Sequence, residues 1–171
     1  MSGQRLWLIR HAKSDWAQGA KDIDRPLNER GRRDGPFMAE WLHGQPHAAT
    51  WLWTSTALRA RETAAYVARA WELDDKVVVQ EPQLYLASPT AALEVIRGTP
   101  ADATSVAVVF HNPGITDLVN LLAGRQVLDN LPTFGIAEFS TSLPWAEVHY
   151  SSFELERVVS PKALRLLDGG R

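Results

Sequence analysis

The chain has 171 residues, of which 45% are hydrophobic and 22% are charged, and its formal net charge is −2. This composition is typical of one globular domain, here residues 1–171, and excludes disordered proteins and strongly basic, nucleic-acid-binding proteins. Cysteine is absent, which excludes disulfides, zinc–thiolate sites, iron–sulfur clusters and cysteine nucleophiles.

The length of the apolar runs and the composition of the N-terminus indicate the cellular location of the protein. The longest unbroken apolar runs have four or five residues, whereas a transmembrane helix needs about 20. The first five residues, Met-Ser-Gly-Gln-Arg, lack the apolar stretch of a signal peptide. We therefore expect a cytoplasmic protein without a membrane partner.

The first part of the chain predicts two strand–helix units. Residues 6–9 form a continuous apolar run typical of a buried strand, and the polar stretch 12–27 predicts a long loop. A helix is predicted over 28–42, although two glycines and a proline weaken its first half. A second strand at 51–53 precedes a helix that extends to Trp71. The candidate caps of that helix are Thr54, Ser55 and Thr56.

The rest of the chain continues the alternation and then departs from it. The remaining predicted elements are, in order, a strand at 77–79, a helix at 88–97, a strand at 105–110, a helix at 112–124 and two antiparallel strands at 136–140 and 147–155. Ser88-Pro89 and Asn112-Pro113 are both predicted to open a helix with a cap followed by proline. Strand and helix thus alternate four times, which predicts an α/β fold with a largely parallel sheet covered on both faces.

Cationic and imidazole side chains follow three of these strands, at the edge where such sheets bind ligands. Arg10 and His11 follow the first strand, Arg59 lies in the first turn of the helix after the second, and His111 follows the fourth. Guanidinium groups and helix N-termini bind phosphoryl oxygens, and a neutral imidazole can attack phosphorus. The sequence therefore predicts a metal-free phosphatase. In it, Arg10, Arg59 and Lys13 attract the phosphoryl group to His11, and His111 binds its oxygens.

Three motifs carry a resemblance to the histidine phosphatase superfamily. They are Leu8-Ile9-Arg10-His11-Ala12, Ser55-x-x-x-Arg59-Ala60-x-x-Thr63-Ala64 and His111-Asn112-Pro113-Gly114. The short chain and the segments 10–16 and 24–31 are similar to the SixA-type phosphohistidine phosphatase branch of that superfamily.

The resemblance implies a fold and a set of roles. The fold would be a three-layer α/β/α sandwich around a mixed sheet. His11 would be the phosphorylated nucleophile, Arg10 and Arg59 the phosphate clamps, and His111 the second pocket histidine. A segment of the loop that follows resembles the family's substrate-facing part, and it contains the candidate binding residues Ser14 and Arg25.

A general acid that protonates the leaving group is not evident. Glu81, after the third strand, and Asp15, four residues past His11, are the candidates, and the alternative is a solvated or capping loop carboxylate in each case. An alkoxide leaving group needs a proton, because the pKa of its conjugate acid is close to the value of about 15.7 for water. Imidazole, whose conjugate acid has a pKa of about 6.5, departs as a neutral ring. We therefore predict phosphohistidine in a protein as the substrate.

Two other functions remain open. The first is a phosphatase of small phosphoesters, such as a sugar phosphate or a nucleotide, whose activity would depend on Glu81 or Asp15. The second is a non-catalytic module that binds phosphate or a phosphoprotein, although such a module would not need His11. The expected partner is thus a phosphohistidine-bearing protein or a small phosphorylated molecule, with no metal, cofactor or nucleic acid.

Two further features lie in the polar stretch 12–27. Trp16 lies in the loop beside the predicted pocket and either stacks on a substrate or covers the loop. Asp22 and Asp24 have the spacing found in aspartate-nucleophile phosphatases, but no apolar strand precedes them. We therefore exclude an aspartate nucleophile.

Overall fold

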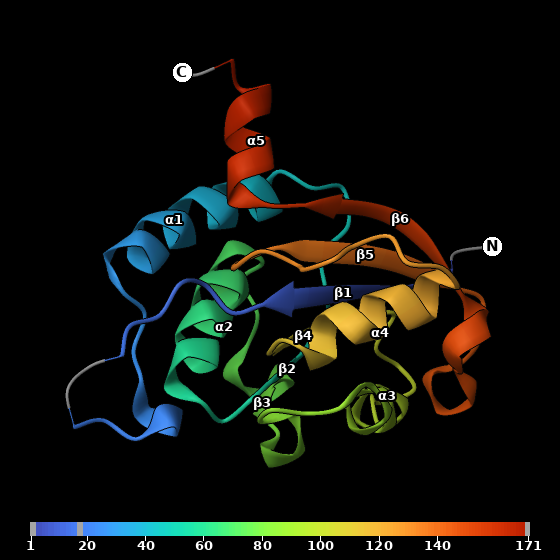
Figure 1. Ribbon diagram of the computed structural model, residues 1–171. Helices are drawn as coiled ribbons and strands as arrows, with labels where there is room; N and C mark the ends of the chain where they lie inside the picture. Colours follow the sequence, from blue (N-terminus) through green and yellow to red (C-terminus); the bar gives the residue numbers. More distant parts are fainter. Residues whose placement is uncertain (1–2, 17–18, 170–171) are drawn as a thin grey trace.

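A computed structural model of the protein describes residues 3–16 and 19–169 (Figure 1). Its centre is a six-stranded sheet in the order β3-β2-β4-β1-β5-β6. The strands are β1 (Gln4–Arg10), β2 (Trp51–Thr54), β3 (Val78–Gln80), β4 (Ser105–Phe110), β5 (Ile136–Thr141) and β6 (Phe153–Val159). The first four are parallel to one another, and β5 is antiparallel to both of its neighbours. The predicted mixed, mostly parallel sheet is confirmed.

Helices cover both faces of this sheet. The helices are α1 (Glu29–His43), α2 (Leu58–Ala70), α3 (Pro89–Arg97), α4 (Gly114–Ala123) and α5 (Pro161–Leu167). One hydrophobic core lies between the sheet and α3 and α4, and a second lies between the sheet and α1, α2 and α5. The fold is therefore the expected three-layer α/β/α sandwich.

The apolar run of β1 follows from its central place in the sheet. Leu6 and Leu8 pack into the core beside α3 and α4, whereas Trp7 and Ile9 pack into the core beside α1 and α2. All four side chains are fully buried. A strand that is buried on both faces must be apolar at every position, which is why the sequence shows a continuous run instead of an alternation.

The C-terminal part differs from the prediction. The segment predicted as a strand over 147–155 instead contains two 3₁₀ turns, Trp145–Glu147 and Tyr150–Ser152, and β6 begins only at Phe153. The buried indole of Trp145, whose N–H donates to the carbonyl of Ala103 at 2.6 Å, anchors the first turn, and the side chains of His149 and Ser152 cap the second. Helix α5 was not predicted, although it opens with Ser160 as its cap and proline after it.

Two predicted helix starts are also wrong. The cap of α2 is Ala57, not one of the three hydroxyl residues before it, because the hydroxyl of Ser55 turns toward the pocket described below. Helix α4 begins at Gly114 with Pro113 as its cap, and the side chain of Asn112 binds neighbouring loops instead of capping the helix.

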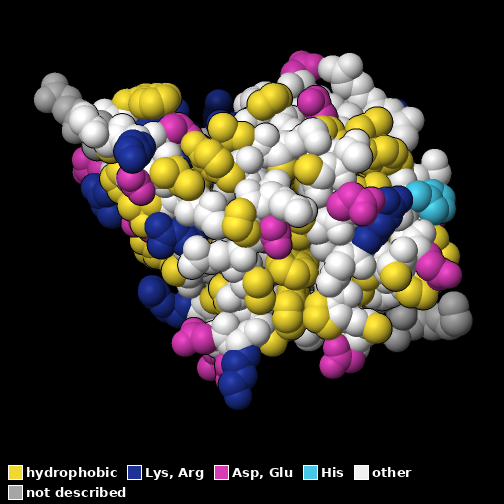
Figure 2. Space-filling model, turned by 90° about the horizontal axis from the view of Figure 1, so that it is seen from below, with side chains coloured by type: hydrophobic (Ala, Val, Ile, Leu, Met, Phe, Trp, Pro, Cys, Tyr) yellow, Lys and Arg dark blue, Asp and Glu magenta, His cyan; other side chains and the backbone are white. Residues whose placement is uncertain are grey.

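The surface carries its charges unevenly. Figure 2 shows, on the face seen from below, that Lys and Arg side chains gather mainly on the left, the side toward which β1 points in Figure 1.

No helix in the described part of the chain is long and apolar enough to span a membrane.

Candidate active site

A cavity of about 390 Å³ opens where β1, β2 and β4 end. Seven residues singled out from the sequence line it, namely Arg10, His11, Lys13, Ser14, Arg25, Arg59 and His111. Trp16, which the sequence also placed beside the pocket, lines it as well, together with Asp22, Leu86, Asn112 and Thr133. The parallel topology thus brings the ends of three strands together at one pocket, as the sequence predicted.

His11 follows β1 and is held in one tautomer. Its Nδ1 lies 2.8 Å from the carbonyl oxygen of Ala12. A carbonyl only accepts a hydrogen bond, so Nδ1 carries the proton and Nε2 keeps the lone pair. Burial lowers the pKa of His11 from 6.5 to about 3, the hydrogen bond to Ala12 opposes that shift, and three neighbouring guanidinium groups add to it. The ring is therefore neutral at pH 7, the state that a nucleophile needs.

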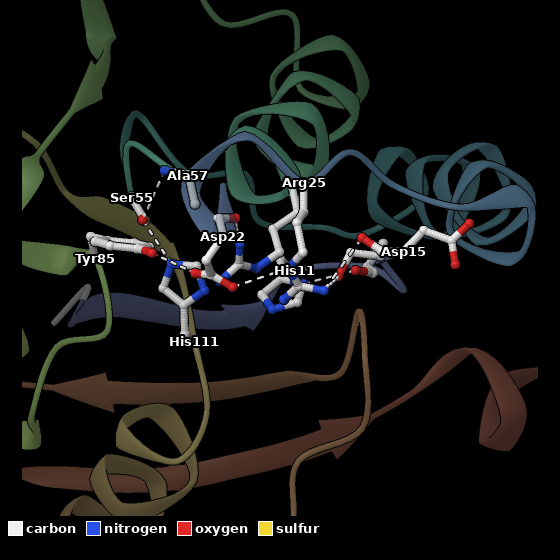
Figure 3. Close-up of polar contacts among 11 residues, drawn as sticks. His11, Asp15, Asp22, Arg25, Ser55, Ala57, Tyr85 and His111 are labelled. Carbon is white, nitrogen blue, oxygen red and sulfur yellow. Dashed lines mark hydrogen bonds and ion pairs between the residues drawn. The ribbon is translucent and has the colours of Figure 1, made fainter. Parts of the chain in front are cut away.

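His111 follows β4, and its ring faces that of His11 with centroids 5.2 Å apart. Its Nε2 lies 2.7 Å from the hydroxyl oxygen of Ser55, which also accepts a hydrogen bond from the amide of Ala57 at 3.2 Å (Figure 3). Burial and the nearby charges of His11 and Arg59 lower the pKa of His111 to about 3. If the Ser55 hydroxyl donates to Nε2, the proton of the neutral ring lies on Nδ1. That nitrogen is buried and has no partner in the described part of the chain.

Two arginines supply positive charge. Arg10 ends β1 and donates to the carbonyl of Leu131 at 2.9 Å, and Arg59 lies in the first turn of α2. The Nε atoms of both are buried without a hydrogen-bond partner among residues 3–16 and 19–169. A buried donor without an acceptor is costly, and a bound oxyanion would remove that cost.

Asp22 joins the charged groups of the pocket. It lies in a 3₁₀ turn, Asp22–Asp24. Its Oδ2 accepts from Arg59 at 3.1 Å and from the hydroxyl of Tyr85, and its Oδ1 accepts from Arg25 at 3.0 Å. Burial opposes ionisation of Asp22, but the hydrogen bonds from Tyr85 and Arg59 outweigh it and lower the pKa to about 2. The carboxylate is ionised, and it orients both guanidinium groups.

Sequence reasoning missed Asp22, which lines the pocket, and Tyr85, which donates a hydrogen bond to Asp22. Asp22 and Tyr85 are 63 positions apart in the sequence, and Asp22 and Arg59 are 37 positions apart. One local signal was present, because an arginine in the first turn of a helix is unfavourable against the helix dipole and indicates a partner. That partner is Asp22.

The comparisons with known proteins agree with this geometry. The model of the histidine phosphatase superfamily (branch 1) matches residues 6–84. A protein of Mycobacterium tuberculosis strain H37Rv is 33% identical over 149 residues, which cover 82% of this chain and 91% of that protein. A Nakamurella multipartitia structure assigned as the phosphohistidine phosphatase SixA has a TM-score of 0.82 and 27% identity, and the match covers 94% and 98% of the two chains.

The chain belongs to the histidine phosphatase superfamily. A SixA-type structure from Agrobacterium tumefaciens is similar as well, with a TM-score of 0.78 and 27% identity over 92% of this chain and 99% of that chain. A mycobacterial glucosyl-3-phosphoglycerate phosphatase, with a TM-score of 0.66 and 16% identity over 91% and 97% of the two chains, shares the fold. Family and neighbours support a phosphatase of the SixA-like branch, and the fold alone does not choose between a protein and a small molecule as substrate.

In this histidine phosphatase, the loop after His11 is anchored by close contacts. The amide of Ala12 donates to the hydroxyl of Thr63 at 2.9 Å, and that hydroxyl donates to the carbonyl of Arg59 at 2.8 Å. The carbonyl of Lys13 packs on Gly31 of α1, where a Cβ would lie only 2.2 Å from the oxygen. Thr63 and Gly31 therefore fix the loop after His11 relative to Arg59.

The two candidate general acids lie outside the cavity. The carboxylate of Glu81 accepts a hydrogen bond from the amide of Gln83 at 3.0 Å and caps a 3₁₀ turn. The side chain of Asp15 is exposed and points away from His11 (Figure 3). Neither carboxylate is placed to protonate a leaving group at His11 in this structure.

Within residues 3–16 and 19–169, no three His, Asp or Glu side chains form a group that could hold a metal ion. The positive charge of this pocket comes from Arg10, Lys13, Arg25 and Arg59.

Proposed function

We propose that the protein is a phosphohistidine phosphatase, which removes the phosphoryl group from phosphohistidine in another protein through a phosphorylated His11. The observation that carries this proposal is the state of Asp22. It is the one carboxylate that lines the described pocket, and its pKa is lowered to about 2. The pocket therefore binds a phosphoryl group but offers no carboxylic acid to protonate an alkoxide.

The first step transfers the phosphoryl group between two imidazoles. Nε2 of His11 attacks phosphorus while the P–N bond of the substrate breaks, and its electron pair stays on the departing nitrogen. The substrate ring carries a proton on its other nitrogen, so it departs as neutral imidazole. The carbonyl of Ala12 accepts a hydrogen bond from Nδ1 of His11 and stabilises the phosphorylated ring.

The second step expels an imidazole as well. Water attacks the phosphoryl group, the bond to Nε2 breaks, and the electron pair returns to His11 as the water proton passes to phosphate or solvent. This step displaces the imidazole of His11 from phosphorus without a general acid. The same pocket can therefore displace the imidazole of a substrate in the same way. Arg10 and Arg59 stabilise the charge on the phosphoryl oxygens in both steps, and His111 donates to one of them.

A paired turnover assay tests the proposal. With chelator present, wild type and His11→Ala are compared on a histidine-phosphorylated protein, p-nitrophenyl phosphate and a sugar phosphate. We expect preferential turnover of phosphohistidine, abolished in His11→Ala. Faster turnover of the sugar phosphate would replace the proposed substrate with a small phosphoester. Phosphate binding without turnover would indicate a binding module.

A further inference from the structure

Two large apolar side chains stand exposed at the mouth of the pocket. Trp16 is 74% exposed and Leu86 is 59% exposed, and both line the same cavity as His11. They come from different parts of the chain, the loop after β1 and the loop after the 3₁₀ turn Pro82–Leu84. We call Trp16 and Leu86 the apolar rim. Exposed apolar side chains beside a polar pocket indicate a contact with a ligand or partner.

The ring of Trp16 is held in place by charged neighbours. The guanidinium carbon of Arg25 lies 3.9 Å from the centroid of the indole. Arg25 is itself fixed by Asp22 at 3.0 Å and by the hydroxyl of Ser14 at 3.2 Å. One face of the indole is thus stacked on a group of the phosphate pocket, and most of the side chain is exposed. A preorganised aromatic ring binds a flat or apolar group with little loss of entropy.

Leu86 occupies a strained position. Its φ angle is 52°, in the left-handed region that disfavours residues with a branched side chain and suits glycine or asparagine. The neighbours of Leu86 fix this conformation, because the hydroxyl of Tyr85 binds Asp22 and the carbonyl of Ala87 packs on Gly114. A leucine with more than half of its surface in water gains little from packing here. Packing within the chain therefore does not account for a leucine at this position.

The side chain of Asn112, which also lines the cavity, is engaged within the chain. The amide of Asn112 already donates to Asn130 at 2.7 Å and to the carbonyl of Leu131 at 3.2 Å, and its oxygen accepts from Thr116. Asn112 thus offers a ligand little at this edge of the cavity, whereas the exposed side chains of Trp16 and Leu86 are open to a ring or an apolar side chain.

We propose that the apolar rim is a specificity site that binds the leaving group, namely the imidazole ring of phosphohistidine and apolar side chains next to it in the substrate protein. This inference rests on the proposed function. The pocket binds the phosphoryl group that all substrates share, and the rim distinguishes a protein-borne phosphohistidine from a small phosphorylated molecule.

The test compares two substrates with the same P–N bond. One is a peptide with a single phosphohistidine flanked by leucines, and the other is phosphoramidate, which has no ring and no apolar neighbour. The variants are Trp16→Ala and Leu86→Asn, and asparagine tolerates the φ angle of position 86. Leu121→Asn is the matched control, since Leu121 is an exposed leucine of α4 outside this cavity. Thermal unfolding of each variant checks that it is folded.

We expect the ratio of kcat/KM for the peptide to kcat/KM for phosphoramidate to fall about tenfold or more in each rim variant, mainly through KM. Trp16→Phe should retain most of the ratio, and Leu121→Asn should retain all of it. An unchanged ratio in Trp16→Ala and Leu86→Asn would overturn the proposal that the apolar rim is a specificity site, and it would leave the proposed function intact. A wild-type enzyme that hydrolyses phosphoramidate but not the peptide would overturn both proposals.

Discussion

Acidification should destabilise this fold through its two pocket histidines. Mainly because of burial, the pKa values of His11 and His111 are lowered from 6.5 to about 3. In the unfolded chain both return to their ordinary value. Between pH 6.5 and about 3, the unfolded state therefore binds protons that the folded state does not. The contribution of the two neutral imidazoles to the stability of the folded state is therefore fully present above pH 6.5, and it is lost as the pH falls through this window.

The size of the effect follows from proton linkage. Each proton bound only by the unfolded state lowers the free energy of unfolding by about 1.4 kcal/mol per pH unit. Two imidazoles lower it by about 2.7 kcal/mol per unit, so a fall of two units removes about 5 kcal/mol. Domains have a total stability of about 5–15 kcal/mol, so this loss is a large part of it. The lowered pKa of Asp22 acts in the same direction, but only as the pH falls below 3.8 toward about 2.

Urea unfolding between pH 7 and 4.5 measures this dependence without the contribution of Asp22. The variants His11→Asn and His111→Asn should each reduce the slope of the unfolding free energy against pH by about 1.4 kcal/mol per unit. His47→Asn, at an exposed position, serves as the control and should keep the wild-type slope. Equal slopes in wild type and in both pocket variants would show that the imidazoles are not held neutral, and would refute this reasoning.

Three substitutions test other parts of the site. Arg59→Lys removes the guanidinium that donates to Asp22 and whose unpartnered Nε is proposed to bind a phosphoryl oxygen, so kcat/KM should fall by about 10²–10³; a loss below fivefold in steady-state turnover would contradict the proposed role. Ser55→Ala removes the partner of His111 Nε2, so kcat should fall about tenfold and thermal unfolding should show a loss of about 1–3 kcal/mol; unchanged kcat would rule out the tautomer argument. Gly31→Ala adds a Cβ 2.2 Å from the carbonyl of Lys13. Urea unfolding should therefore show a loss of about 1–3 kcal/mol, although alanine favours a helix by about 1 kcal/mol; a stabilised variant would contradict the close contact.

The parts of the fold that the sequence predicted are those with local causes. Runs such as 105–110 are apolar at every position because both faces of the sheet are covered, and the helices between them have one apolar face. Parallel order then requires that the residues after β1, β2 and β4 meet at one edge. The topology alone therefore predicts that His11, Arg59 and His111 share one pocket, and all three line it.

The parts that the sequence did not predict depend on contacts between distant segments. Asp22 lies in a polar loop without periodicity, and its partners Arg59 and Tyr85 are 37 and 63 positions away. The turn at Trp145 forms because the indole reaches the carbonyl of Ala103, which no local pattern indicates. Such contacts arise only when the layers have packed.

The proposed reaction transfers the phosphoryl group of phosphohistidine to Nε2 of His11. It is tested most directly by rapid-quench labelling with a protein that carries ³²P-phosphohistidine, followed by mapping of the labelled enzyme at alkaline pH. We expect label on His11 within the first turnover, as the Nε2-phosphorylated isomer, because Nδ1 is occupied by the hydrogen bond to Ala12. Release of labelled phosphate with no label on the enzyme, or label on Nδ1, would contradict the account.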